Sequence, residues 1–191
     1  MPALILASTS RYRQELLSRL RLPFEAVAPN VDEAALPGEM PAALAERLAL
    51  AKARAVAAQH PGAIVLGSDQ VADLDGEAIG KPGSHERAAD QLRRMSGREV
   101  VFQTAVAVVA PGVAAIERAA VRVRFRQLSD AAIEAYLRAD EPYDCAGSAK
   151  VESLGVALLE AVESDDPTAL IGLPLIRTCA LLRRAGLEPL A

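Results

Sequence analysis

Aromatic residues are scarce in this chain of 191 residues: they make up 3% of the sequence, and tryptophan is absent. Aliphatic side chains must therefore fill the interior. Hydrophobic residues, mostly Ala, Leu and Val, make up 51% of the sequence, which excludes a disordered chain and is enough for a sizeable core. No internal repeat, low-complexity tract or linker interrupts the sequence, so we expect one domain over residues 1–191.

Long apolar runs are missing as well. No run reaches membrane-spanning length, and the N-terminus lacks a basic leader followed by a long apolar core. Cys145 and Cys179 are too few for a disulfide framework, and no metal-type Cys/His spacing surrounds them. These absences predict a soluble cytoplasmic protein with reduced thiols and no membrane partner.

Positive charge is not in excess. The formal net charge of −4 argues against a broad binding surface for a nucleic acid polymer, so bound phosphates must meet locally clustered Lys and Arg. The sequence contains no Gly-x-x-x-x-Gly-Lys-Ser/Thr string of the P-loop type. His60 and His85 have no nucleophile arrangement around them, and we expect both to be surface residues.

A strand followed by an acid stands near the middle of the chain. The apolar run at residues 64–66 predicts a short buried strand. Gly67 and Ser68 end that run, and Asp69 comes just past its end. Ligands bind at the ends of strands in open α/β sheets, so a carboxylate at this point is well placed for chemistry.

A hairpin is predicted directly after this strand. Asp75-Gly76 favours a tight turn, because both residues tolerate the positive φ that such turns demand. The return strand, residues 77–79, then brings Lys81 back toward Asp69. The alternative is that Asp69 caps a loop and Lys81 is a solvated surface charge, since charged residues are common at strand ends.

The N-terminus predicts a strand, a polar turn and a helix, at residues 3–7, 8–10 and 11–22. The start of a helix after such a turn aims backbone N–H groups and hydroxyls at an anion. Arg11 and Arg13 would oppose the helix dipole there, so their presence indicates a bound anion. The alternative is that the turn only caps the helix and both arginines face solvent.

Two more charged groups precede the hairpin. Asp32 and Glu33 stand in a Pro/Asn loop, where carboxylates either hold a hard cation such as Mg²⁺ or are ordinary loop acids. Residues 41–60 predict an amphipathic helix, with Lys52 near the edge of its apolar stripe. The ammonium of Lys52 either reaches water or points into a cleft against Glu33 or a phosphate.

The second half of the chain alternates helices and strands. Small residues interleaved with Lys150 and Glu152, within residues 140–155, are typical of a backbone that approaches a ligand closely. The remaining patterns predict a helix at 84–95 capped by Ser84, a strand hairpin at 98–109 and 113–125, a helix from Ser129 to about Arg138, and a last helix at 175–185.

Read together, the polar motifs follow a specific order. They are Ser8-x-Ser10-x-x-Arg13, Asp32-Glu33, the Lys52 helix, Gly67-Ser68-Asp69-Gln70, Gly80-Lys81-Pro82, Ser96-Gly97, Glu141-Pro142, Ala146-Gly147 and Gly172-Leu173-Pro174. In this order the chain resembles the Maf family of nucleotide pyrophosphatases along essentially its whole length. The resemblance implies an α/β fold of two lobes around a central mixed sheet with a deep cleft, similar to the inosine triphosphate pyrophosphatase architecture.

Three positions resemble the branch of the family associated with 7-methyl-GTP hydrolysis: Tyr12, Gln70 and Glu152. The dTTP/UTP-type branch would have Arg, Thr and Gln there. Hydrolysis of a dTTP- or UTP-type nucleotide is one alternative, and a non-catalytic regulator of cell division is another. The chain departs from the family pattern at three positions, with Arg11 in place of Pro, Gln14 in place of a second Arg, and Thr168 in place of Asn.

The reaction implied by the resemblance is hydrolysis between the α and β phosphates, which releases pyrophosphate. It needs a base for water, a divalent cation and positive charge along the triphosphate. We expect Asp69 to accept the proton or to hold a metal-bound water. The other predicted roles are Glu33 with Asp69 for Mg²⁺ or Mn²⁺, Lys52, Lys81 and Arg13 for the phosphoryl charge, and Ser8 for a terminal phosphate.

The base has its own predicted contacts. Tyr12 stacks on the cationic methylated guanine, and Glu152 accepts hydrogen bonds from its N1–H and amino groups. Gln70 reads the base or the ribose, and Lys150 belongs to the same substrate-binding set. The alternative is that Tyr12 is a half-exposed helix residue and Glu152 pairs with Lys150. The nucleotide is the expected partner, and the resemblance is also compatible with a homodimer.

Overall fold

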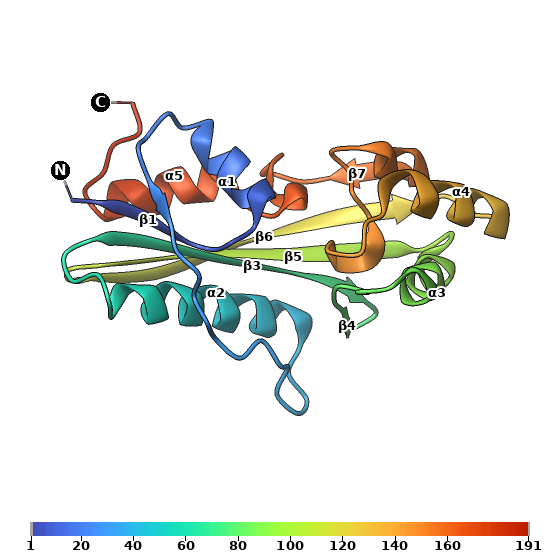
Figure 1. Cartoon of the computed structure of the whole chain (residues 1–191), viewed down its shortest axis with the longest axis horizontal. Helices are drawn as coiled ribbons and strands as arrows, with labels where there is room; N and C mark the ends of the chain where they lie inside the picture. Colours follow the sequence, from blue (N-terminus) through green and yellow to red (C-terminus); the bar gives the residue numbers. More distant parts are fainter. Residues whose placement is uncertain (1, 191) are drawn as a thin grey trace.

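A seven-stranded mixed sheet forms the centre of the computed structural model, which describes residues 2–190 (Figure 1). The strands are β1 (Leu4–Ala7), β2 (Glu25–Ala26), β3 (Ile64–Leu74), β4 (Glu77–Ile79), β5 (Glu99–Ala110), β6 (Val113–Phe125) and β7 (Leu159–Glu163). The helices are α1 (Arg11–Ser18), α2 (Pro41–Ala57), α3 (His85–Met95), α4 (Asp130–Asp140) and α5 (Leu175–Arg184), with the 3₁₀ turns η1 (Ala146–Ser148), η2 (Leu154–Leu158) and η3 (Ala169–Ile171).

The strand order is β2-β1-β3-β5-β6-β7. Strand β4 pairs with the same edge of β3 as β1, but farther along β3. Strand β1 is parallel to both β2 and β3, whereas all other pairs are antiparallel. The expected mixed α/β sheet is therefore confirmed. The parallel strands β1 and β2 lie at one end of the sheet, and the long antiparallel strands β3, β5 and β6 extend to the other end.

Helices cover both faces of the sheet in the first lobe, which contains β1, α1, α2 and α5 with the adjoining parts of β3 and β5. Side chains alternate across a strand, so Leu4 and Leu6 of β1 pack with α1 and α5, while Ile5 and Ala7 pack with α2 on the opposite face. Figure 1 shows α2 below the sheet and α1 with α5 above it. All four residues of β1 are buried, as is typical of a strand covered on both faces.

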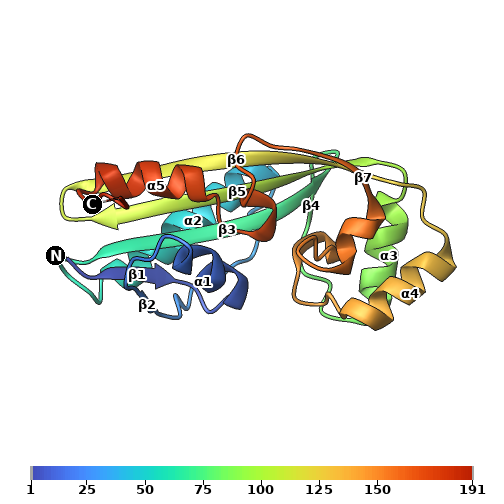
Figure 2. The same cartoon turned by 90° about the horizontal axis from the view of Figure 1, so that it is seen from above.

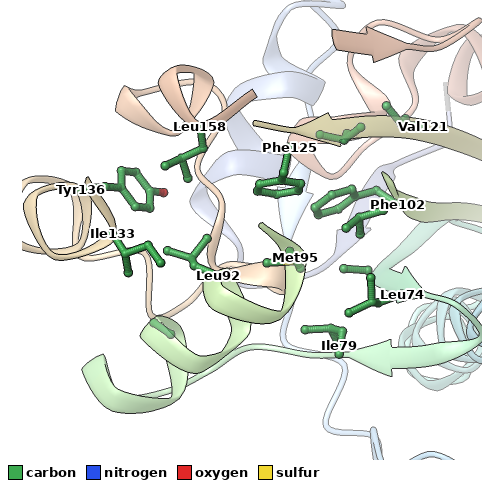
Figure 3. Close-up of a cluster of buried hydrophobic side chains, with 14 of the residues drawn as sticks. Leu74, Ile79, Leu92, Met95, Phe102, Val121, Phe125, Ile133, Tyr136 and Leu158 are labelled. Atoms are coloured by element: carbon green, nitrogen blue, oxygen red, sulfur yellow. The ribbon is translucent and has the colours of Figure 1, made fainter. Parts of the chain in front are cut away.

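The second lobe surrounds the far ends of β3, β5 and β6. It contains α3, α4 and β7, which lie apart from the other helices in Figure 2. Its core includes Phe102, Phe125 and Met95, with Leu92 and Ile133 from the two helices (Figure 3). Aliphatic side chains fill the first lobe as predicted, but two of the three phenylalanines are among the largest fully buried side chains and belong to this second core.

Several local predictions are confirmed. Ser84 and Ser129 accept hydrogen bonds from the backbone N–H groups that open α3 and α4. The turn between β3 and β4 has φ values of 54° at Asp75 and 86° at Gly76, and β4 has the predicted bounds. His85 is a surface residue as predicted, with 40% of its side chain exposed, and its ring nitrogens lie 3.0 Å from the Tyr143 hydroxyl and 2.9 Å from Glu134 Oε2.

The predicted end of the central strand is wrong. Strand β3 does not stop at Leu66 but spans eleven residues, from Ile64 to Leu74. The extension is stable because the partner strand β5 pairs with Ser68, Asp69 and Gln70 without interruption. Asp69 therefore lies inside a strand.

No helix within residues 2–190 combines the length and the apolar character needed to cross a membrane.

Candidate active site

The candidate site lies where β1 ends beside β3. Pairing between these strands stops at Ala7 opposite Gly67, and β4 resumes pairing on the same side of β3 only at Ala72. Residues 68–71 therefore have an open edge. Ligands in α/β sheets bind outside the carboxyl ends of parallel strands, and here the strand that ends is β1.

A cavity of about 460 Å³ occupies this opening. Seven of the side chains predicted to bind substrate or metal line it: Ser8, Arg13, Glu33, Lys52, Asp69, Gln70 and Lys81. A second cavity of about 360 Å³ shares Arg13, Gln70 and Lys81 with the first, and Tyr12 and Glu152 also line it. The two cavities therefore form one continuous cleft. Of the predicted set, only Lys150 lies outside both.

Lys52 joins the two acids of the first cavity. Its Nζ lies 2.6 Å from Glu33 Oε1 and 2.7 Å from Asp69 Oδ1. The side chains of Lys52 and Asp69 are 5% and 10% exposed, whereas Glu33 is 54% exposed. The ammonium therefore points into the cleft against Glu33, which was one of the two predicted orientations. Burial alone would raise the pKa of Glu33, but the Lys52 hydrogen bond and the charges of Lys52, Lys81 and Arg13 outweigh it, so this pKa is lowered.

Gly67 explains how Lys52 reaches Asp69. A Cβ at this position would lie 2.2 Å from Ala49 O and 2.6 Å from Ala53 N, both in α2. Only glycine allows the helix backbone to approach β3 this closely. Alternation along the strand then points Asp69, two residues later, to the α2 face, where Lys52 lies.

Arg13 and Lys81 complete the positive side of the cavity. Arg13 follows the N-cap Ser10, and its Nε donates to Gly172 O at 2.9 Å. Burial lowers the pKa of Arg13, and the negative charges of Asp69 and Glu33 act in the opposite direction. Lys81 is exposed and follows the end of β4. Ser8 is buried, and its hydroxyl accepts from Ser10 N at 3.1 Å.

The second cavity has an aromatic ring and carboxylates. Tyr12 is half-buried, with the Arg11 guanidinium 4.8 Å from the ring centroid and hydrogen-bonded to its hydroxyl at 2.8 Å. Burial raises the pKa of Glu152, and the charges of Asp140 and Asp144 raise it further, while Lys150 opposes them. A cation bound beside the Glu152 carboxylate would therefore stabilise its ionised form.

Lys150 and Gln70 are committed to protein contacts. Lys150 Nζ donates to Asp140 O at 2.8 Å and has no ion pair with Glu152 among residues 2–190. Gln70 Nε2 lies within 3.0 Å of Thr104 Oγ1, Ala169 O and Leu170 O. The amide hydrogens of Gln70 are thus directed at Thr104 and η3, while the residue lines both cavities.

The sequence analysis missed the wall formed by Leu170, Ile171 and Gly172, which lines the second cavity. Two signals could have indicated it. Gly172-Leu173-Pro174 predicts a helix start, but its Gly172 also belongs to this wall. Thr104 is a fully buried polar residue inside an apolar strand, and its hydroxyl donates to Ala169 O at 2.9 Å.

The oxygen ligands for a cation are limited. Within residues 2–190, no group of three or more His, Cys, Asp or Glu side chains could hold a metal ion. Glu33 and Asp69 do converge on one cationic point, the Lys52 ammonium. These two carboxylates alone do not complete the coordination shell of a hard cation, which takes about six or more oxygen ligands.

Two relatives are similar to this chain over nearly its whole length. A protein of Albidiferax ferrireducens named 7-methyl-GTP pyrophosphatase is 65% identical over 98% of this chain and 95% of its own length. One of Bordetella pertussis with the same name is 64% identical over 99% of this chain and 95% of its own.

Two solved structures resemble part of the fold. A HAM1 protein from Coxiella burnetii aligns over 65% of this chain and 73% of its own, with 18% identity and a TM-score of 0.48. A dITP/XTP pyrophosphatase from Mycobacterium abscessus aligns over 66% and 75%, with 20% identity and a TM-score of 0.45. The sequence matches the Maf-like protein family over residues 3–185, and the chain therefore belongs to the Maf family.

Proposed function

We propose that the protein is a nucleoside triphosphate pyrophosphatase that hydrolyses the bond between the α and β phosphates, giving a nucleoside monophosphate and pyrophosphate. The observation that carries this proposal is the shared cavity of Glu33, Lys52, Asp69 and Lys81. These residues come from a loop, a helix, a strand and the segment after a hairpin. Their convergence provides the acids and cations that phosphoryl transfer requires.

Asp69 is the group that takes the proton from the attacking water. Lys52 donates to its Oδ1, and among residues 2–190 no other hydrogen bond to this carboxylate is present. Oδ2 is thus the oxygen that can receive a proton. The water oxygen bonds to one of the two phosphorus atoms, and the bond from that phosphorus to the bridging oxygen breaks. The electron pair stays on the bridging oxygen of the departing group, which is pyrophosphate or the nucleoside monophosphate. Arg13 and Lys81 face the negative charge that develops there.

Glu33 and Asp69 are the residues that would hold a Mg²⁺ or Mn²⁺ ion. Both present hard oxygen atoms, and Mg²⁺ in nucleotide sites is commonly held by one or two carboxylates together with phosphate oxygens and water. When bound, such a cation neutralises phosphate charge and makes water more acidic. The requirement for a cation is checked by measuring turnover with and without Mg²⁺ or Mn²⁺.

The proposed substrate is 7-methyl-GTP. Relatives at 64–65% identity carry that name, and the base end of the cleft is suited to a cationic ring. Methylation at N7 makes guanine cationic, so stacking on the Tyr12 ring would contribute about 0.5–2 kcal/mol. The Glu152 carboxylate accepts from the guanine N1–H and amino groups, with attraction between opposite charges.

A panel of 7-methyl-GTP, GTP, UTP and dTTP, with detection of pyrophosphate, tests the reaction and the base preference together. We expect Asp69→Asn to lose at least about 100-fold in kcat. Asp73→Asn is the matched control, because Asp73 lies on the same strand but lines neither cavity. Folded Asp69→Asn with activity within a few-fold of wild type would refute the assignment. Nucleotide binding without pyrophosphate release would instead support a non-catalytic regulator.

Glu152→Gln tests the base contact. The neutral amide loses the attraction to a cationic base, so we expect the ratio of kcat/KM for 7-methyl-GTP over GTP to fall toward one. Unchanged ratios for 7-methyl-GTP, GTP and UTP would contradict the role of Glu152.

A further inference from the structure

One wall of the second cavity is held by hydrogen bonds from the sheet. It consists of η3 and Gly172, and its residues Leu170, Ile171 and Gly172 line the base end of the cleft. The side chains that hold it come from β3 and β5, on the sheet face opposite to Asp69. Alternation along β3 places Ser68 and Gln70 on this face, and register pairs Gln70 with Thr104 of β5.

Ala169 O is the first attachment point. It accepts from Thr104 Oγ1 at 2.9 Å, from Gln70 Nε2 at 2.9 Å and from Gly172 N at 3.0 Å. Thr104 is fully buried, and it also accepts from Gln70 Nε2 at 3.0 Å. The Thr104 hydroxyl therefore links the sheet to the carbonyl that also fixes the Gly172 N–H.

Gly172 O is the second attachment point. It accepts from Arg13 Nε at 2.9 Å and from the buried Ser68 hydroxyl at 3.0 Å. The single proton of Ser68 also faces Ala105 O at 2.7 Å, so it is shared between two carbonyls. Gly172 has a φ of 124°, a conformation that other residues rarely adopt. The direction of the Gly172 carbonyl, and hence the position of Arg13, depends on the hydrogen bonds at both attachment points, Ala169 O and Gly172 O.

We propose that Thr104 and Ser68 are positioning residues that act through the Gly172 carbonyl on the guanidinium of Arg13. With Nε anchored on Gly172 O, the two terminal nitrogens of Arg13 are left for the cavity, where Asp69 and Glu33 act on its charge. Because Nε is fixed by its hydrogen bond, the two terminal nitrogens of the guanidinium point in a fixed direction, as bidentate phosphate recognition requires. The proposal rests on the proposed function for the identity of the anion that Arg13 binds.

The test compares Thr104→Val and Ser68→Ala with Thr178→Val. Thr178 is also fully buried, and its hydroxyl donates to Pro174 O at 2.8 Å, but it lines neither cavity. All three variants lose one buried hydroxyl. We expect similar shifts in the urea midpoint, but a loss of about 10- to 100-fold in kcat/KM for 7-methyl-GTP only in the first two, because small misplacements of a phosphate-binding group are costly.

Two further measurements separate positioning from a general structural role. Thr104→Ser keeps the hydroxyl and should recover most of the activity. In an Arg13→Lys background, which has no Nε contact to lose, Thr104→Val should reduce kcat/KM by less than about threefold. If the losses in kcat/KM from Thr104→Val and Arg13→Lys multiply in the double variant, the proposal is wrong. An equal loss of kcat/KM in Thr178→Val would also overturn it.

The Arg13 side chain also gives a signal that does not depend on turnover. In ¹H–¹⁵N spectra of arginine Nε–H groups, the anchored Arg13 should show a slowly exchanging peak in wild type and in Thr178→Val. That peak should exchange fast in Thr104→Val and Ser68→Ala, and unchanged exchange would refute the positioning role. If the wild-type protein is inactive on every nucleotide, the proposed function is wrong. The positioning role is then still decided by this spectrum, because the spectrum does not depend on turnover.

Discussion

Replacement of Lys52 by methionine is the perturbation with the largest expected effect on both stability and activity. Lys52→Met keeps most of the side-chain volume but removes the ammonium that lies 2.6 Å from Glu33 Oε1 and 2.7 Å from Asp69 Oδ1. It leaves Asp69, whose side chain is 10% exposed, as a buried carboxylate without its hydrogen-bonded ion-pair partner. Such a group is costly unless it is paired.

The magnitude follows from the burial of the two acids. Removing one partner of a buried ion pair costs about 3–5 kcal/mol. The contact with Glu33 adds little, because that side chain is 54% exposed and solvent screens it. We therefore expect a loss of about 3 kcal/mol in the free energy of unfolding. For a chain of this size each kcal/mol lowers Tm by about 2–4 °C, so Tm should fall by about 6–12 °C.

The assay is thermal and urea unfolding at pH 7, with kcat measured beside it. We expect kcat to fall by about 100-fold or more, because a preorganised cation is lost from the phosphate site. Lys81→Met is the control: Lys81 is exposed, so activity should fall while Tm stays within about 2 °C of wild type. Lys52→Met/Asp69→Asn removes the orphaned charge as well, and should recover part of the lost Tm without recovering activity.

The pH dependence adds a second check. The pKa of Glu33 is lowered in the folded state, so its ionised form stabilises the protein above the unfolded pKa and this contribution is lost as the pH falls through the folded pKa. Wild type should therefore lose stability below about pH 4.3, whereas Lys52→Met has less to lose there. A variant that melts within about 2 °C of wild type, or whose Tm does not rise when Asp69 is neutralised, would refute the reasoning.

Three further outcomes are expected. Because burial, with nearby carboxylates, raises the pKa of Glu152, the preference for 7-methyl-GTP over GTP should weaken on acidification toward pH 5, and Glu152→Gln should show a flat ratio of kcat/KM. Gly67→Ala places a Cβ 2.2 Å from Ala49 O, so the urea midpoint should fall and activity should fall with it as α2 moves away from β3. Burial, followed by the Asp144 charge, raises the pKa of Cys145 to about 12, so mass spectrometry should find it slow to react with iodoacetamide at pH 8 and faster as the pH rises.

Local chemistry made much of the fold predictable. The caps at Ser84 and Ser129 and the Asp75-Gly76 turn depend on hydrogen bonds and φ values within a few residues, so their residue types indicate them directly. The end of β3 could not be predicted in the same way. Gly67 looks like a strand terminator, but its role is to admit α2, which is a contact between distant segments.

The site was predictable as a set of charges and not as a geometry. Glu33, Lys52 and Asp69 have residue types that fit phosphate chemistry, and the structure brings them together. The attachment of η3 to Thr104 joins residues 65 positions apart through a carbonyl, which has no side-chain signature in the sequence. The side-chain amide of Gln70 was assigned to the base or ribose, yet its hydrogen bonds go to the same turn.

Strands β3, β5 and β6 run without a break from the first lobe into the second (Figure 2). Separating two lobes connected in this way would mean bending a continuous hydrogen-bonded ladder. The relative position of the two lobes is consequently set by backbone pairing. Selection among nucleotides should then depend on fit to a preformed opening, with little contribution from closure around the bound molecule.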